Sequence, residues 1–175
     1  HWEGGKGERI PSYANRVIQD DTTKIFSAQV WSPPKKYNWK IKNFTPSRTA
    51  LMIYEAHVGM ATQLEKVGTY SEFAENVLPV IKNAGYNTIQ LMAIQEHPFY
   101  GSFGYHVSNF FAASSRFGTP EELKELIDKA HQAGIAVIMD LVHSHSVRNV
   151  MEGLALLDGS PGQFFHTNDR RIHKA

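Results

Sequence analysis

The stretch MDLVHSHSV, residues 139–147, contains one aspartate and two histidines close together. His143 and His145 are two positions apart and share one face of an extended segment, where Asp140 could add an oxygen ligand for a metal ion. Two histidines are few ligands, however, and an H-x-H pattern alone is a weak signal. The aspartate and His145 could instead hydrogen-bond the hydroxyls of a substrate or orient another catalytic residue, and both histidines could simply be satisfied by backbone carbonyls.

A second candidate is the aromatic segment EHPFYGSFGYHVSNFFAASSRFG, residues 96–118. It is too long for a plain strand-to-helix connection, and connections of this length are usually functional or disordered. Its many aromatic residues argue against disorder. Aromatic rings beside polar groups suit sugar binding, because the C–H faces of a pyranose stack on rings while its hydroxyls take hydrogen bonds. Tyr105 is the favoured platform, whereas Phe110, Phe111 and Phe117 are expected to anchor the loop to the core.

The elements that must position these residues alternate between strand and helix patterns. In parallel α/β proteins of this kind the site gathers at the C-terminal ends of the strands, here in residues 57–69, 96–118 and 140–148. The expected connections are right-handed, giving a parallel sheet that is open or begins a barrel. The last strand is continuously apolar, which is typical of a sheet covered on both faces. The predicted elements are a strand over 51–58, a helix over 71–85, a strand over 87–94, a helix over 119–134 and a strand over 135–142.

The ends of both helices have recognisable signals. Ser71 is expected to cap the start of the first helix, Gly85 to end it, and Pro79 to kink it because a mid-helix proline removes a hydrogen bond. Thr119 and Glu122 form a capping box around a proline at the first helical position, and a glycine ends the second helix.

Residues 1–46 differ from the rest and are predicted to end a small β module, with a strand in KIFSAQVW, residues 24–31. The proline-containing segment 31–47 is typical of a connector. Tyr37, Trp39 and Lys40 within it could bind a ligand, but a strand that packs its rings against the neighbouring domain is the favoured alternative. The predicted domains are therefore residues 1–46 and residues 47–175.

The composition excludes several classes of protein. The 175 residues are 42% hydrophobic and 20% charged, as in one or two globular domains. The formal charge is only +1 with no block of like charge, so neither nucleic acid nor a membrane surface is an expected partner. The absence of cysteine favours a cytoplasmic location, and no apolar run approaches the roughly 18 residues of a membrane span. The chain starts with His1, which suggests a piece of a longer protein.

Three stretches resemble the glycogen (1,4-α-glucan) branching enzymes of the α-amylase superfamily: MIYEAHVG (52–59), the long run from VLPVIKNAG to DLVHSH (77–145), and GLALLDGSPGQFFH (153–166). The resemblance runs almost unbroken from about residue 51 to residue 166. It implies an α/β fold, a partial (β/α)8 TIM barrel containing the first three strands, in residues 47–175. Residues 1–46 resemble the tail of the β-sandwich carbohydrate-binding module that precedes this barrel.

The resemblance also implies roles for individual residues. Tyr105 matches the tyrosine that stacks on the sugar in the −1 subsite, and His145 matches the histidine that hydrogen-bonds the same sugar. Asp140 matches the aspartate that braces the active-site network, whereas His143 has no catalytic counterpart. Ser144 stands where amylases usually have a calcium-binding asparagine, and serine is a poorer ligand than a carbonyl oxygen, so we expect neither bound calcium nor a cofactor.

The family transfers a segment of α-1,4-glucan to a 6-hydroxyl by a retaining double displacement, which needs a carboxylate nucleophile and a carboxylic acid/base. Both belong to family motifs beyond residue 175, so we expect no catalysis by this chain alone. The expected partners are α-1,4-glucans (glycogen, amylose and maltooligosaccharides), and the uncovered barrel edges predict self-association. Two alternatives remain: a metal-dependent TIM-barrel hydrolase using His143 and His145, and a non-catalytic glucan-binding module using Tyr37, Trp39 and the aromatic loop.

Overall fold

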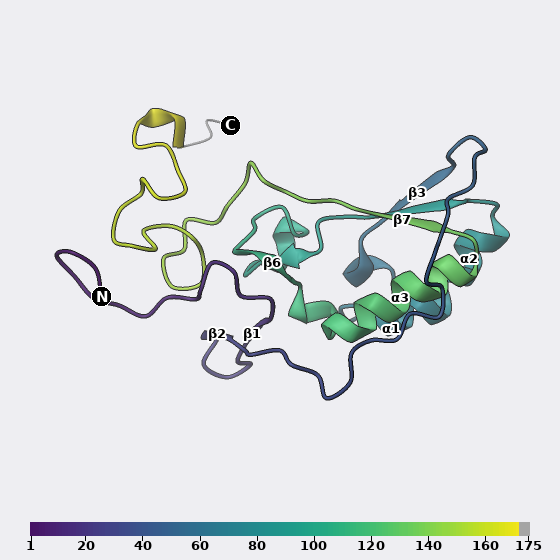
Figure 1. Ribbon diagram of the computed structural model, residues 1–175, viewed down its shortest axis with the longest axis horizontal. Coiled ribbons are helices and arrows are strands. Elements are labelled where there is room, and N and C mark those ends of the chain that lie inside the picture. The colour runs from purple at the N-terminus through teal and green to yellow at the C-terminus, as the bar shows by residue number, and fades with distance from the viewer. Residues whose placement is uncertain (172–175) are drawn as a thin grey trace.

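The computed structural model describes residues 1–171 and contains a three-stranded parallel sheet, which lies away from the N-terminus (Figure 1). The strand order is β3, β4, β7, and both neighbouring pairs are parallel. Each strand lies within the range predicted for it but is shorter, and strand and helix alternate along the chain as predicted. The strands are β3 (Ile53–Ala56), β4 (Thr88–Leu91) and β7 (Ala136–Met139).

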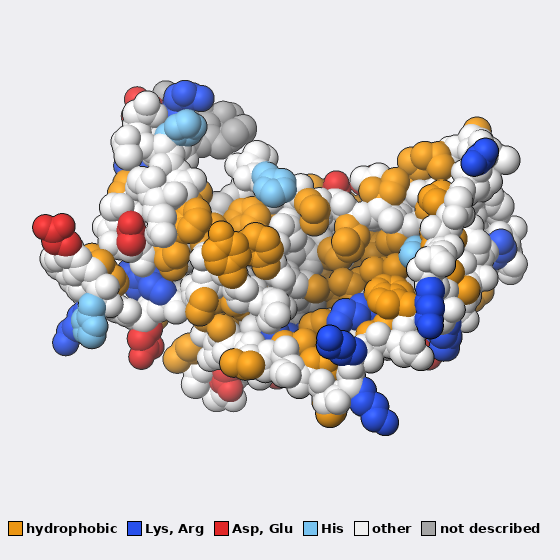
Figure 2. All heavy atoms as spheres, in the orientation of Figure 1, with side chains coloured by type: hydrophobic (Ala, Val, Ile, Leu, Met, Phe, Trp, Pro, Cys, Tyr) orange, Lys and Arg blue, Asp and Glu red, His pale blue; other side chains and the backbone are white. Residues whose placement is uncertain are grey.

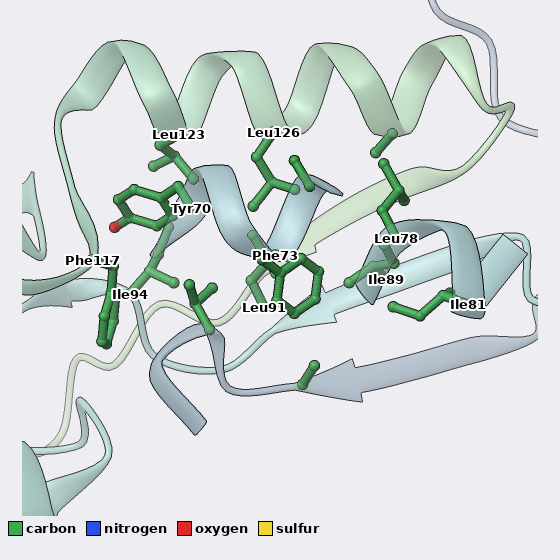
Figure 3. Close-up of a cluster of buried hydrophobic side chains, with 14 of the residues drawn as sticks. Tyr70, Phe73, Leu78, Ile81, Ile89, Leu91, Ile94, Phe117, Leu123 and Leu126 are labelled. Carbon is green, nitrogen blue, oxygen red and sulfur yellow. The ribbon is translucent and has the colours of Figure 1, made fainter. Parts of the chain in front are cut away.

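Helices pack on one face of this sheet and enclose the main hydrophobic core (Figure 3). They are α1 (Tyr70–Glu72), a π-helical segment (Phe73–Val77), α2 (Leu78–Asn83) and α3 (Pro120–Gln132). On β7, Ile138 and Met139 remain 40% and 43% exposed, so the expectation that both faces of this strand are covered is wrong for the described residues. The largest fully buried side chains are Tyr70, Phe73, Phe117, Ile81 and Ile89.

The N-cap of the first helical stretch is Thr69, two residues before the predicted cap. The Thr69 hydroxyl accepts a hydrogen bond from the Glu72 amide at 3.2 Å, and the Glu72 carboxylate accepts one from the Thr69 amide at 3.0 Å. This reciprocal pair is a capping box, which needs Glu three residues after the cap and therefore selects Thr69 over Ser71. The Ser71 hydroxyl instead donates to Glu122 at 3.1 Å and so links the two helices.

Pro79 was predicted to kink the middle of a regular α-helix. In the structure it does not lie in the middle of one, because the helix changes its winding before the proline. The Leu78 amide bonds to the Phe73 carbonyl five residues earlier, the spacing of a π-helix. The α-helix α2 then starts at Leu78, so Pro79 lies in its first turn, where a missing N–H leaves no hydrogen bond unmade. Gly85 ends the helix with a φ of 86°, as expected for a C-terminal glycine.

The second helix, α3, follows its sequence signals closely. Thr119 caps it, and the Thr119 and Glu122 side chains form the predicted capping box. Gly134, with a φ of 77°, lies just beyond its C-terminal end. Within residues 1–171, none of the helices has the length and apolar character needed to cross a bilayer.

The N-terminal residues contain one antiparallel pair of short strands, β1 (Val17–Gln19) and β2 (Phe26–Ala28). The second strand confirms the prediction for residues 24–31. The segment that follows runs along α3 without forming a strand. The Trp31 indole donates to Glu121 at 2.7 Å, and Phe44 stacks on His131 with 4.0 Å between ring centroids.

One buried carboxylate on α3 holds the middle of this segment. Asp128 accepts hydrogen bonds from the Tyr37 hydroxyl at 3.1 Å and from the amides of Lys40 and Ile41 at 2.9 and 3.0 Å. Trp39 lies edge-on to Tyr37 at 5.0 Å. Tyr37 therefore packs against the neighbouring region, as favoured from the sequence, although through irregular backbone instead of a strand.

Candidate functional site

The structure brings two of the predicted site residues together at the C-terminal edge of the sheet. The Tyr105 hydroxyl donates a hydrogen bond to Oδ2 of Asp140 at 3.0 Å. Asp140 directly follows β7, and its amide donates to the Leu91 carbonyl at the end of β4 at 3.0 Å. Burial, the hydrogen bond to Asp140 and the negative charges of Asp140 and Glu55 raise the pKa of Tyr105. The phenol therefore keeps its proton and remains a donor.

Tyr105 reaches this position because of a close backbone approach just before it. Gly104 has a φ of 88°, and a Cβ there would lie 1.8 Å from the Ala93 carbonyl oxygen. Only glycine fits such a conformation and contact without strain. The Tyr105 ring packs on a buried cluster of Ala93, Val107 and Val142, so one edge of the ring is fixed by the protein.

His145 lies on the segment that follows Asp140, and that segment is tied to the aromatic loop. The Val107 amide donates to the His145 carbonyl at 3.1 Å, and the Val147 amide donates to the Val107 carbonyl at 2.9 Å. The imidazole Nδ1 of His145 lies 2.6 Å from the Ser144 hydroxyl. Tyr105 and His145 thus belong to two segments joined through Val107.

His143 takes no part in a metal cluster of the described chain. Its ring stacks on Phe110 with 6.0 Å between centroids and 22° between planes. Within residues 1–171 no group of three or more His, Cys, Asp or Glu side chains is placed to hold a metal ion. The metal-dependent alternative needs at least a third ligand beside His143 and His145, and the described part of the chain does not place one there.

The predicted role of the three phenylalanines holds only in part. Phe117 is fully buried in the core, and Phe110 is partly buried against the cluster around Tyr105. Phe111 is 59% exposed, with its ring 4.9 Å from that of Tyr13, so it does not anchor the loop to the core. Phe110 and Phe111 are adjacent in β6 (Asn109–Ala113), which pairs with β5 (Gln95–Glu96). Because neighbouring side chains of a strand point to opposite sides, the two rings cannot both pack on the same cluster.

Gln95 is a site residue that the sequence did not reveal. Its buried side-chain amide accepts a hydrogen bond from the Val142 amide at 2.8 Å and donates one to the Phe110 carbonyl at 3.1 Å. It thereby joins the segment of Asp140 to the loop of Tyr105. A polar residue just after a buried strand was the available signal.

A row of side chains on the uncovered face of the sheet was also missed. Glu55 on β3 lies opposite Gln90 on β4, and the Gln90 amide donates to the Glu55 carboxylate at 3.3 Å. Glu55 is close enough for its charge to raise the pKa of Tyr105. Such a row is hard to predict from the sequence, because each mostly apolar strand contributes only one residue to it and the row forms only when the strands pair.

Two further histidines, His57 after β3 and His97 at the start of the aromatic segment, are buried. The His57 Nδ1 accepts a bond from the Met60 amide at 3.1 Å, and the His97 Nδ1 lies 2.9 Å from the Gln95 carbonyl, to which it must donate. The Nε2 atoms are therefore a donor on His57 and an acceptor on His97, and neither has a partner among the described residues. Both rings lie against Phe117, at 5.3 and 6.0 Å between centroids.

The protonated forms of both histidines are disfavoured. Burial lowers the pKa of His57. Burial also lowers the pKa of His97, and repulsion by Arg116 and His57 acts in the same direction. The hydrogen bond to the Gln95 carbonyl raises this pKa but is outweighed. Burial raises the pKa of the neighbouring Glu96, whose carboxylate accepts a bond from the Ser115 amide at 2.7 Å.

Comparison with known proteins shows the family of this chain. The family model for the alpha amylase catalytic domain matches residues 60–157, more than half of the chain. The chain therefore belongs to the alpha-amylase family. The crystal structure of a Salmonella typhimurium protein assigned as an alpha amylase is similar, with a TM-score of 0.61, 27% identity, and 81% of this chain and 22% of that chain covered. This likeness supports a TIM-barrel-type fold.

The curated relatives are more specific. A 1,4-alpha-glucan-branching enzyme of Dictyostelium discoideum is 53% identical over 167 residues, covering 95% of this chain and 24% of the relative. The enzyme of the same name from Saccharomyces cerevisiae is 52% identical, covering 94% of this chain and 25% of the relative. These similarities confirm the resemblance found in the sequence. The chain spans about a quarter of the length of these relatives.

Proposed function

We propose that this chain forms part of a 1,4-α-glucan branching enzyme, which cleaves an α-1,4-glucan and transfers the segment to a 6-hydroxyl to form an α-1,6 branch. The observation that carries the proposal is the hydrogen bond between Tyr105 and Asp140 beside the His145 segment. It lies at the strand ends, where barrel enzymes place their sites, in a chain about half identical to branching enzymes.

In this proposal the described residues bind and orient a glucosyl unit. The free face of the Tyr105 ring stacks on the C–H face of the sugar in the −1 subsite. Asp140 accepts a hydrogen bond from the Tyr105 hydroxyl and thereby fixes the rotation of that ring, and His145 hydrogen-bonds a sugar hydroxyl. No described carboxylate is assigned as the nucleophile or the acid/base that a retaining displacement needs.

The proposal extends to the organisation of the chain and to its partners. Residues 1–46 are the end of a β-sandwich carbohydrate-binding module, a proposal supported by the antiparallel pair β1–β2, and residues 47–175 are the N-terminal portion of the barrel. The substrates are glycogen, amylose and maltooligosaccharides. A cytoplasmic location is part of the proposal, although a relative in Arabidopsis thaliana is named as chloroplastic/amyloplastic.

The test uses the protein produced from the complete reading frame, with amylose as the substrate and new α-1,6 linkages counted by proton NMR. Removing the groups that orient the sugar, by Tyr105→Ala, Asp140→Asn or His145→Ala, should lower kcat/KM by about 100-fold or more. Val80→Ala, which shortens an exposed apolar side chain on α2 outside every candidate site segment, is the control and should retain activity.

Two outcomes would overturn the proposal. Wild-type protein that hydrolyses glucan without forming branches is not a branching enzyme. Activity that a chelator removes and zinc restores, together with loss in His143→Ala equal to that in His145→Ala, would favour the metal-dependent hydrolase.

A further inference from the structure

The segment from Asp140 to His145 depends on other parts of the chain for its shape, because within it the structure shows neither helix nor strand. The middle one of three hydrogen bonds that fix its backbone is made by a side chain, that of Gln95. In chain order, the Asp140 amide donates to the Leu91 carbonyl at 3.0 Å, the Val142 amide to the Gln95 side chain at 2.8 Å, and the Val107 amide to the His145 carbonyl at 3.1 Å. The shape of the segment therefore depends on which residue stands at position 95.

The Gln95 side chain matches two backbone groups of opposite kind. Its Oε1 accepts from the Val142 amide, and its Nε2 donates to the Phe110 carbonyl at 3.1 Å. A neutral primary amide offers an acceptor and a donor together, whereas a carboxylate only accepts and an alkyl group does neither. Glutamine is thus the side chain that joins an N–H of one segment to a C=O of the other.

Gln95 is itself held firmly and is shielded from water. Its strand, β5, pairs with β6, and its carbonyl lies 2.9 Å from Nδ1 of His97, which donates to it. Gln95 is 5% exposed, and Figure 2 shows hydrophobic side chains gathered on the surface over β6. In such surroundings a hydrogen bond is stronger than in water, and a lost one is costly because water cannot readily replace it.

The two backbone groups that Gln95 joins lie beside the groups that we propose bind the sugar. Val142 follows Asp140 by two residues and belongs to the buried cluster on which the Tyr105 ring packs. A displacement of Val142 would therefore change the 3.0 Å hydrogen bond between Tyr105 and Asp140. Gln95 makes no contact with the sugar in this arrangement, because its side chain is buried and both of its polar atoms are used.

We propose that Gln95 is a positioning residue of the candidate site: its side-chain amide sets the spacing between the Asp140–His145 segment and the loop of Tyr105, and thereby aligns the sugar for reaction. This inference rests on the proposed function for the identity of the sugar. A displacement of about 1 Å in an active site can cost roughly 100-fold in rate. Because Gln95 acts through other residues, its loss is expected to lower kcat and to leave KM almost unchanged.

Gln95→Glu is the sharpest variant, because it keeps the size of the side chain and changes only its donor. The ionised carboxylate has no proton for the Phe110 carbonyl, whereas the protonated acid can donate to Phe110 and accept from Val142. Burial favours the protonated acid as the pH falls. In the protein produced from the complete reading frame, with amylose as substrate, kcat relative to the wild type should be roughly 10- to 100-fold lower at about pH 8. It should recover to within about threefold at about pH 5.5, with KM within about twofold throughout.

The control variants separate positioning from loss of stability. Gln95→Met removes both hydrogen bonds at every pH, so its kcat should stay low across the whole range. Ile81→Val shortens a core side chain on α2 that is 1% exposed, which lowers stability away from the site and should leave kcat unchanged. The titratable residues next to Gln95 and its partners are the same in the wild type and in Gln95→Glu, so their effect cancels in the ratio of the two. They are Glu96, His97, Tyr105, Asp140 and His143.

A second measurement does not need the reaction. The backbone amide NMR signals of Asp140 and His145 should differ from those of the wild type in Gln95→Glu at high pH and should return toward them at low pH. A wild-type protein that forms no branches would overturn the proposed function, whereas these shifts would still support the positioning role of Gln95.

Three results would overturn the inference and leave the proposed function intact. The first is a kcat of Gln95→Glu equal to that of the wild type at every pH. The second is a kcat lowered by the same factor at every pH, because the missing donor would then not be the cause. The third is a loss in Ile81→Val as large as that in Gln95→Met, because reduced stability alone would then explain both.

Discussion

The two faces of the parallel sheet teach different lessons about this molecule. On the helix-covered face, Ile89 and Leu91 of β4 are at most 1% exposed and lie beneath the helices (Figure 3). On the other face, Glu55 and Gln90 pair with each other, and Ile138 in the same row is 40% exposed. One face therefore holds the fold together, and the other lies open beside the groups that we propose bind substrate.

This separation has a physical basis. Apolar burial is non-directional and tolerates no unpaired polar group, so the helix-covered face carries apolar side chains. A binding surface needs polar groups in fixed directions, which here come from strand ends and loops. We expect changes on the two faces to affect different measured quantities, and the following experiments test this from the largest effect to the smallest.

The strongest test compares one deletion on each side of the sheet. Leu126→Ala removes a core side chain that is 1% exposed and should lower the free energy of unfolding by about 4 kcal/mol. Ile138→Ala removes a side chain that is 40% exposed and should cost less than about 1 kcal/mol. Urea unfolding followed by circular dichroism measures both. Equal losses would mean that the open face is covered in solution.

The next test concerns the loop that carries Tyr105. Gly104→Ala should lower the free energy of unfolding by about 3 kcal/mol, because the new methyl would meet the Ala93 carbonyl oxygen in a strained backbone conformation. Gly85→Ala is the matched control, since Gly85 has a similar φ of 86° and nothing within 4 Å of the added carbon. It should cost about 1 kcal/mol. A control as costly as Gly104→Ala would show that φ alone explains the effect.

The third test concerns Asp128, on the side of α3 that faces the N-terminal segment. Asp128→Asn replaces one of the two acceptor oxygens by an NH2 group, so the donors of Tyr37, Lys40 and Ile41 can no longer all be satisfied. The free energy of unfolding should fall by about 2 kcal/mol. Glu125→Gln, on the same helix and in an exposed ion pair with Lys129, should cost less than about 0.5 kcal/mol. Urea unfolding again measures both, and equal small losses would show that the Asp128 carboxylate does not hold the segment.

Asp128 also predicts a pH dependence. Burial raises its pKa, but the hydrogen bonds from the three donors outweigh burial, so the pKa lies below its ordinary value of 3.8. Its contribution is therefore complete above about pH 4 and is lost as the pH falls through the folded-state value. Asp128→Asn should remove this part of the acid sensitivity, as unfolding curves between pH 5 and pH 2.5 would show.

Local sequence signals predicted the elements but not every contact between them. The capping box of Thr119 and the three strands were predictable because they depend on residues close in sequence. The cap at Thr69 was equally local, since Glu72 follows at the required spacing, but Ser71 obscured it. The exposure of Phe111 depends on the pairing of β6 with β5 and on the Tyr13 turn, both distant in sequence.

For the candidate site, too, the residues could be predicted but the contacts between them could not. Residue types and spacing singled out Tyr105, Asp140 and His145 as candidates, and the resemblance to a family added the role of each. Their hydrogen bonds could not be predicted, because Tyr105 and Asp140 are 35 residues apart and meet only when two loops fold onto one edge of the sheet. Gln95 was missed for that reason, since its two partners lie on different segments.

The smallest effect belongs to the buried histidines, which lie where the covered core meets the site. Because burial lowers the pKa of His57 and His97 in the folded state, the unfolded chain binds more protons once the pH falls below about 6.5. Their contribution to stability is complete above that pH and is lost as the pH falls toward the folded-state values. The slope is at most about 1.4 kcal/mol per pH unit for each histidine.

His97→Gln should reduce that slope between pH 6.5 and pH 5, because glutamine can still hydrogen-bond but cannot take up a proton. The control is Leu126→Ala, which destabilises the same core without removing a titrating group and should keep the wild-type slope. A slope unchanged in His97→Gln would mean that His97 takes up its proton over the same pH range in the folded protein as in the unfolded chain. The protonated Nε2 would then need a negative partner, and Glu96 is the adjacent carboxylate that could provide it.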